Sequence, residues 1–189
     1  MLRAAADLIV ERGLDALSLA RVAERAGVSK RTLYTYFDSR EALLDDLFHW
    51  SEELTLELGG ALIPAGLDTL PDVAKNLWHA WDEQGTLHQA IVMIDAATHD
   101  DGPSAGRRAR HDALARGVAD LRPDLSADVA DHLGSAFHAV VSAPVFERLT
   151  AQDGLDTDTA AELVSWMVSA MRDALAAKRD PDLPVTSNA

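Results

Sequence analysis

Apolar residues recur every three to four positions along most of the chain, which is the period of an amphipathic α-helix. Near the N-terminus, Leu2, Ala5 and Ile9 follow this spacing and predict a first helix over about residues 2–12, which Gly13 would end. The period-two alternation of a half-buried strand is absent from the sequence. We therefore expect an all-α fold.

Two short helices are predicted next, separated by a tight turn. Ser18 is a good N-cap for a helix over about residues 19–26, and Gly27 would end that helix. Ser29 would then cap a third helix. Two short helices joined by a glycine-containing turn make a helix-turn-helix, whose second helix can enter the major groove of DNA.

The third helix presents a polar outer face. Leu33 and Phe37 are four residues apart and would share its buried side. The side chains that then point outward are Arg31, Thr32, Thr35 and Tyr36. Arg31 or Lys30 can donate to guanine, the threonines can reach base edges or a thymine methyl, and Tyr36 can bind a phosphate. A merely solvated helix face is the alternative, but the caps and the glycine turn favour DNA binding.

Longer helices are predicted for the rest of the chain. Asp38 or Ser39 would cap a helix that runs to about Glu57, and Asp38 and Glu41 have the spacing of a capping box. Further helices are expected over about 69–83, 104–121 and 158–178, and two more are expected to begin at Thr86 and Ser126. Pro144 would disturb the end of the helix that precedes it, and “DGLDTDT” (residues 153–159) would form a loop with N-cap residues.

The charge of the chain is strongly negative and unevenly distributed. The formal net charge is −14; residues 1–50 contribute −1 and residues 51–189 contribute −13. Five cations cluster between residues 19 and 40, where they face two acidic residues. They are Arg21, Arg25, Lys30, Arg31 and Arg40. Because an acidic body is repelled by a polyanion, one locally basic end would orient the approach to DNA.

Catalytic and cofactor-binding motifs are absent from the sequence. It has no cysteine, no glycine-rich phosphate loop, no nucleophile elbow and no HExxH motif. Asp95 and His99 could share a helix face, with His111 as a third metal ligand, and His79 and Glu83 have the same spacing. Without cysteine or a complete ligand set, we expect no metal, no cofactor and no enzymatic activity. No apolar run reaches the ~18 residues of a membrane span.

The stretch “ADLIVERGLDALSLARVAERAGVSKRTLYTYFDSREALL” resembles the N-terminal domain of TetR-family (TetR/AcrR-like) transcriptional regulators. The resemblance covers residues 2 to about 47, and “ERG”, “VAERAGVS”, “TLYTYF” and “SREALL” fall at family spacing. It implies an all-α homodimer with a three-helix DNA-binding domain and a divergent second domain that usually binds a small molecule and dimerises. The residues that it implies as DNA contacts are Arg21, Lys30, Arg31, Thr32, Tyr34, Thr35, Tyr36 and Arg40.

The resemblance also sets the expected division of the chain. A helix-turn-helix DNA-binding domain would cover residues 1–46, a helical ligand-binding and dimerisation domain 47–180, and a loose C-terminal tail 181–189. “HDDGPS” would form a turn within the second domain. Members of the family often carry a basic arm before the first helix, and this sequence starts almost directly with that helix. Unless it is truncated, we expect weaker and more salt-sensitive DNA binding.

Two sites are expected in the second domain. Large apolar side chains that could line a pocket for an apolar or aromatic ligand are Trp78, Trp81, Met93 and Phe137. An ordinary place in the core is the alternative for each of them. The last two long helices are the candidate homodimer interface. Their small residues, which would allow close approach of helices, are Gly134, Ala136, Ala170 and Ala174. An intramolecular core face is the alternative there.

These expectations lead to one functional hypothesis and two alternatives. The resemblance implies a cytoplasmic bacterial regulator, bound to the nucleoid when on DNA, that represses at a palindromic, inverted-repeat operator and is released by a small-molecule inducer. A transcriptional activator of the same fold is the first alternative. A helical small-molecule-binding or interaction protein without DNA binding is the second, and the basic face around Lys30 and Arg31 argues against it.

Overall fold

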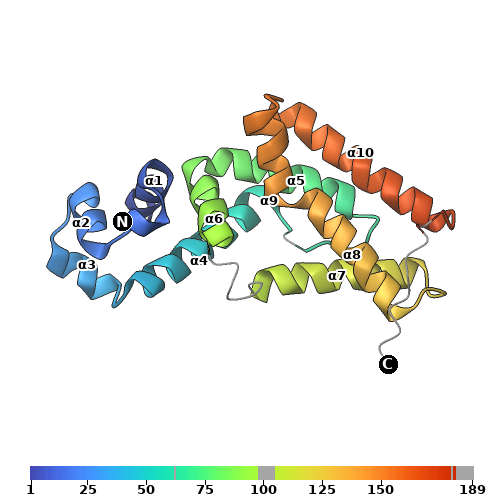
Figure 1. The fold of residues 1–189 in the computed structure, drawn as a ribbon, viewed down its shortest axis with the longest axis horizontal. Helices are drawn as coiled ribbons and strands as arrows, with labels where there is room; N and C mark the ends of the chain where they lie inside the picture. The colour runs from blue at the N-terminus through green and yellow to red at the C-terminus, as the bar shows by residue number, and fades with distance from the viewer. Residues whose placement is uncertain (62, 98–104, 180, 182–189) are drawn as a thin grey trace. The chain divides into compact units, whose positions relative to one another are not determined.

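The computed structural model describes all residues except 62, 98–104, 180 and 182–189. The described part consists of helices and the turns between them, without β-strands (Figure 1). This confirms the expected all-α fold. None of the helices within the described ranges is both long enough and apolar enough to cross a membrane. The expected “HDDGPS” turn and nearly all of the expected tail lie outside the described residues.

The first two helices have the bounds that the sequence predicts, and the third begins after Ser29 as expected. α1 (Leu2–Arg12) is followed by a short 3₁₀ turn, η1 (Leu14–Ala16), and then by α2 (Leu19–Ala26) and α3 (Lys30–Tyr36). No pattern in the sequence predicts η1. Its carbonyl groups matter for the site described below, because two arginine side chains donate to them.

By their internal contacts the residues divide into two compact units, and two helices contribute to both: α4 (Arg40–Gly59) and α5 (Leu70–Gln84). Unit 1 comprises residues 1–57 and 80–102. In it, α1 packs along α6 (Thr86–Ala97). Its buried apolar core includes Ala5, Ile9, Val22, Leu33, Leu43, Leu47, Ala90 and Ile94. The helix-turn-helix therefore rests on a core that α6 completes. The domain boundaries expected at residues 46 and 180 stay predictions.

Along α4, the buried stripe changes from apolar to polar. Leu43 and Leu47 are followed at the same four-residue spacing by Ser51 and Thr55, and all four are buried. Gln84, at the end of α5, accepts a hydrogen bond from Ser51 Oγ at 2.9 Å. Its Nε2 atom donates to Thr55 Oγ1 and to the Ser51 carbonyl. A buried polar network thus ties α4 to α5 within unit 1.

The N-cap of α4 settles an alternative that the sequence leaves open. The Oγ atom of Ser39 accepts a hydrogen bond from the Ala42 amide at 3.1 Å, so Ser39 caps the helix. Asp38 precedes it and is exposed. The capping box expected from Asp38 and Glu41 is therefore replaced by a serine cap.

Unit 2 comprises residues 58–79 and 103–189, and its helices are α7 (Ala105–Leu121), α8 (Ala127–Val141), α9 (Ala143–Glu147) and α10 (Thr157–Ala176). α7 and α8 pack extensively against each other. A Cβ atom on Gly134 would lie 2.8 Å from the Ala115 amide nitrogen. Gly134 therefore serves the packing of α8 on α7, whereas Ala136 and Ala170 remain exposed.

α8 ends at Val141, shortly before Pro144, and a short helix that the sequence does not predict follows at once. Pro144 stands in the first turn of α9, where a missing backbone N–H costs little because that group has no helical partner anyway. A π-helical turn, η3 (Arg148–Gln152), continues the chain. The expected loop stretch begins between η3 and α10, and Asp156 within it caps α10 by accepting from the Thr159 amide at 2.8 Å.

Candidate nucleic-acid interface

The turn between α2 and α3 is built from the residues that the sequence singles out. Ser18 Oγ accepts from the Arg21 amide at 3.4 Å, and Ser29 Oγ accepts from the Thr32 amide at 3.0 Å. Gly27 between them has φ 68° and ψ 26°, a left-handed conformation that side chains with a Cβ atom disfavour. These features fix the angle at which α3 leaves α2.

α3 buries one side and exposes the other. Leu33 and Phe37 are buried in the core of unit 1. The exposed residues of the helix are Lys30, Arg31, Thr32, Tyr34, Thr35 and Tyr36. Tyr34 and Tyr36 expose 54% and 66% of their surface, which is unusual for side chains of this size. A basic, aromatic and hydroxyl-rich face therefore stands free on a helix whose position is fixed from behind.

The two threonine hydroxyl groups of this face make hydrogen bonds within the domain. Thr35 Oγ1 donates to the Arg31 carbonyl oxygen at 2.9 Å, one helical turn earlier. Thr32 Oγ1 lies 2.8 Å from Ser29 Oγ, and either hydroxyl can be the donor. The sequence cannot reveal these bonds, because the rotamers of the side chains decide them.

Arg21 and Arg40 both donate to η1. Arg21 Nη1 lies 3.0 Å from the Ala16 carbonyl oxygen, and Arg40 Nη2 lies 3.1 Å from the Leu14 carbonyl oxygen. A guanidinium group has five N–H donors in one plane, so one such bond orients the group and leaves donor capacity for a phosphate. Arg40 is half-buried and comes from the first residue of α4, whereas Arg21 is exposed on α2.

Arg25, another cation of the basic stretch, forms an ion pair between two helices. Its two terminal nitrogens donate to the two carboxylate oxygens of Glu11 on α1, and Asp7 lies 3.6 Å away. The hydrogen bond from Arg25 lowers the pKa of Glu11. This ion pair joins α1 to α2 and neutralises Arg25, so the basic face depends on the other four cations.

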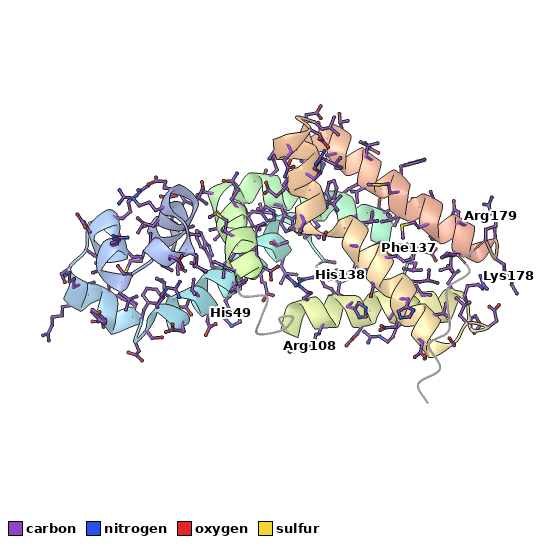
Figure 2. The ribbon with its side chains drawn as sticks, in the orientation of Figure 1. His49, Arg108, Phe137, His138, Lys178 and Arg179 are labelled. Atoms are coloured by element: carbon purple, nitrogen blue, oxygen red, sulfur yellow. The ribbon has the colours of Figure 1, made fainter. Side chains whose placement is uncertain are left out.

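The four residues predicted to line a ligand pocket fall into the two units. In unit 2, Trp78 and Phe137 are fully buried, and Figure 2 shows Phe137 on α8. Trp78 Nε1 donates to the Val141 carbonyl at 3.2 Å, and its ring meets Phe146 edge-on at 5.5 Å. These two residues are packed as core, which is the alternative stated above.

Trp81 and Met93 belong to unit 1 and are half-buried. The Trp81 ring stacks on the ring of His88 with centroids 4.7 Å apart. Burial lowers the pKa of His88 to about 4, so this imidazole is neutral at physiological pH.

The candidate metal ligands do not assemble in the described part of the chain. No group of three or more His, Asp or Glu side chains is placed there to hold a metal ion. His99 lies outside the described residues. His111 Nε2 lies 2.9 Å from Ser135 Oγ on α8, and His79 lies 3.8 Å from Asp158 in unit 2.

A further exposed surface lies on α10. Leu163 and Trp166 expose 38% and 67% of their surface, and Met167 and Ala170 continue the stripe along the helix. An open depression of about 540 Å³ is lined by Asp158, Thr159, Glu162, Leu163 and Trp166. The sequence gives Leu163 and Met167 as apolar positions of this helix but does not single out Trp166. Trp166 follows Leu163 by three residues, the spacing that puts both on one face of the helix, and this spacing is the signal that could have found it.

The fold and the exposed face of α3 define a helix-turn-helix protein. Residues 1–47 match the family described as bacterial regulatory proteins, tetR family. Over 48 residues the chain is 44% identical to an uncharacterized HTH-type transcriptional regulator of Bacillus subtilis, which covers 25% of this chain and 24% of that protein. Over 93 residues it is 26% identical to the HTH-type transcriptional repressor KstR2 of Rhodococcus jostii, covering 49% and 46% of the two chains.

The chain thus matches less than half the length of either relative. The crystal structure of the TetR-family transcriptional regulator PfmR from Thermus thermophilus is similar over 88% of this chain and 95% of that one, with a TM-score of 0.66 and 17% identity. At that identity the likeness shows a common fold. Residues 1–47 thus resemble the tetR family of bacterial regulatory proteins, and the rest of the chain shares the fold of PfmR.

Proposed function

We propose that the protein is a dimeric transcriptional repressor that binds an inverted-repeat operator through α3 and leaves it when a small molecule binds. The observation that carries the proposal is the exposed face of α3. Lys30, Arg31 and two tyrosines stand free there, while Leu33 and Phe37 hold the helix from behind. The similar protein KstR2 is named as an HTH-type transcriptional repressor. Enzymatic activity forms no part of the proposal.

Electrostatics supports a single mode of approach. Most of the net charge of −14 lies outside the first fifty residues, so DNA is repelled by the rest of the chain. Lys30 and Arg31 would donate to base edges in the major groove. Arg21 and Arg40, oriented by the η1 carbonyls, would contact the phosphates on either side. Binding should therefore weaken steeply as salt is added.

The exposed stripe of α10 supports a homodimer through the last two long helices. Soluble monomers rarely leave a tryptophan and neighbouring apolar side chains in water, and tryptophan is enriched at the centres of interfaces. In a two-fold arrangement, Trp166 of one protomer would lie against α8 or α10 of its partner, where Ala136 and Ala170 allow close approach. A dimer also doubles the phosphate contacts of one half-site.

The effector is proposed to be apolar or aromatic and to bind among the helices of the second domain. Because Trp78 and Phe137 are packed as core, a ligand that contacts them must first separate their helices. That requirement gives the ligand different affinities for two conformations, which is what release from DNA needs. To change the ratio of DNA-binding to released conformations from 99:1 to 1:99, the binding free energy of the ligand must differ by about 5.5 kcal/mol between the two.

The test compares DNA binding by the full chain and by variants of α3. DNA flanking the gene for the protein, and if necessary duplexes selected from a random pool, would be titrated at two salt concentrations. Arg31→Ala should weaken binding about ten- to a hundredfold, the usual loss for an arginine that reads a base. Arg116→Ala, which removes an exposed cation of α7, is the matched control and should leave the affinity within about twofold.

Helix content and oligomeric state of each variant would be checked in parallel. Equal affinities of wild type and Arg31→Ala would contradict the assignment of α3 as the reading helix. If the wild-type protein selects no DNA sequence, that result would contradict DNA binding and favour the helical interaction protein. An activator would show the same binding and differ only in whether transcription rises or falls when the operator is occupied.

A further inference from the structure

The centre of the exposed face of α3 is formed by two residues. An α-helix turns about 100° per residue, so positions two before and two after a buried residue lie almost opposite to it. For the fully buried Leu33, those positions are Arg31 and Thr35, and both are exposed. Tyr34 and Tyr36 lie to the two sides of this line. Arg31 and Thr35 are therefore the residues that a groove in front of the helix meets first.

Thr35 presents its methyl group rather than a hydroxyl donor. Its Oγ1 donates to the Arg31 carbonyl oxygen at 2.9 Å, within its own helix. A threonine hydroxyl has one hydrogen, and that hydrogen is used in this bond. The γ-methyl group is the part of the side chain that remains to make a contact in front of the helix.

The major groove offers one apolar group on its base edges, which is the C5-methyl of thymine. We propose that Thr35 determines specificity by packing its γ-methyl group on a thymine methyl, while Arg31 reads a guanine close by. The inference rests on the proposed DNA binding and adds the base step that is read. Four residues advance a helix by about 6 Å, roughly two base-pair steps, so the thymine and the guanine lie within about two base pairs of each other.

Two substitutions separate the methyl group from the hydroxyl. Thr35→Val keeps the branched shape and the methyl group but removes the hydroxyl. Thr35→Ser keeps the hydroxyl and its bond to the Arg31 carbonyl but removes the methyl group. If the methyl group is what reads DNA, Thr35→Val should bind like wild type. If the hydroxyl turns away from Arg31 and donates to a base, Thr35→Ser should bind like wild type instead.

The experiment uses an operator obtained by selecting duplex DNA with the full-length wild-type protein. Each thymine of one half-site is then replaced by uracil, which removes only the C5-methyl group, and affinities are measured by fluorescence anisotropy. At one position, uracil should weaken wild type and Thr35→Val about three- to fourfold, the factor expected for one buried methyl group. Thr35→Ser should not respond to uracil at that position.

The outcomes distinguish this inference from the function on which it rests. An operator that binds wild type equally well with uracil at every position would overturn the inference and leave DNA binding intact. A uracil effect that persists in Thr35→Ser would assign the methyl contact to another residue and would also overturn it. Failure of wild type to select any sequence would overturn the proposed function itself.

Discussion

The guanidinium group of Arg122 donates from Nη1 to the carbonyl oxygen of Leu175, 2.9 Å away, in the last turn of α10. The same carbonyl accepts a hydrogen bond from the Lys178 amide at 3.0 Å, and a cation at the C-terminus of a helix interacts favourably with the helix dipole. Arg122 is buried, and its Nε and Nη2 atoms donate to both oxygens of Asp124. In Figure 2, Lys178 and Arg179 mark the chain just beyond the end of α10.

Arg122→Ala should therefore destabilise unit 2. The substitution leaves the Leu175 carbonyl without this charged donor and opens space beside α10. We expect the free energy of unfolding, measured in urea, to fall by about 1–3 kcal/mol. Asp124→Asn is the matched control, because it keeps the bond between Arg122 and Leu175 and should cost much less. Equal losses for the two variants would assign the effect to the ion pair.

In the buried network around Gln84, removing one polar partner should cost more stability than removing all of the polar partners together. Gln84→Leu removes the partner of Ser51 and Thr55 and leaves two buried hydroxyls with fewer bonds. We expect a loss of about 2 kcal/mol in unfolding free energy. The triple variant Ser51→Ala, Thr55→Val, Gln84→Leu should recover most of this loss, because no polar group is then left behind. A triple variant that is less stable than Gln84→Leu would contradict this account.

His88 should make the stability of the protein depend on pH. Its pKa is about 4 in the folded chain, because burial disfavours the imidazolium, and about 6.5 when unfolded. The unfolded chain therefore takes up the proton first as the pH falls. Between about pH 6.5 and 4, this residue should lower the unfolding free energy by about 1.4 kcal/mol per pH unit.

The measurement is urea unfolding at a series of pH values for wild type and His88→Phe, which keeps an aromatic ring beside Trp81. The difference between the two curves should be constant above about pH 7 and shrink or reverse toward pH 4, as wild type alone loses stability. Parallel curves over the whole range would show that His88 is not the group responsible.

Trp166 should control the oligomeric state. Trp166→Glu places a charge at the centre of the exposed stripe of α10, so a dimer formed there should dissociate to monomers at micromolar concentration. Sedimentation equilibrium measures this directly. Leu56→Ala, which removes a 48%-exposed apolar side chain from α4, is the control and should leave the dimer intact. A Trp166→Glu protein that remains dimeric would place the interface elsewhere.

The sequence predicts the parts of the fold that depend on neighbouring residues. Ser18, Gly27 and Ser29 mark the limits of α2 and α3 because caps and left-handed turns are local events. The bonds from Gln84 to Thr55 and from Arg122 to Leu175 could not be identified in this way, since they join residues 29 and 53 positions apart in the chain. Gly134 suggests close approach of helices, but the sequence does not reveal that the neighbour is Ala115 on α7.

In the candidate site, too, the sequence predicts what depends on neighbouring residues and not what depends on the folded domain. The exposed residues of α3 follow from the positions of Leu33 and Phe37, four residues apart. The sequence does not predict that Thr35 bonds to the Arg31 carbonyl, or that Arg25 is held by Glu11. Both depend on side-chain conformations in the folded domain. They change the chemistry of the face, because one hydroxyl donor and one cation are already used.

Footprinting of the wild-type protein on DNA selected from a random pool, at two salt concentrations, tests the central claim most directly. A dimer that reads DNA through α3 should protect two half-sites in inverted repeat, with centres ~34–36 Å apart and an affinity that falls steeply with salt. Protection of a single unrepeated site, or of no sequence at either salt concentration, would contradict a dimeric protein that reads DNA through α3.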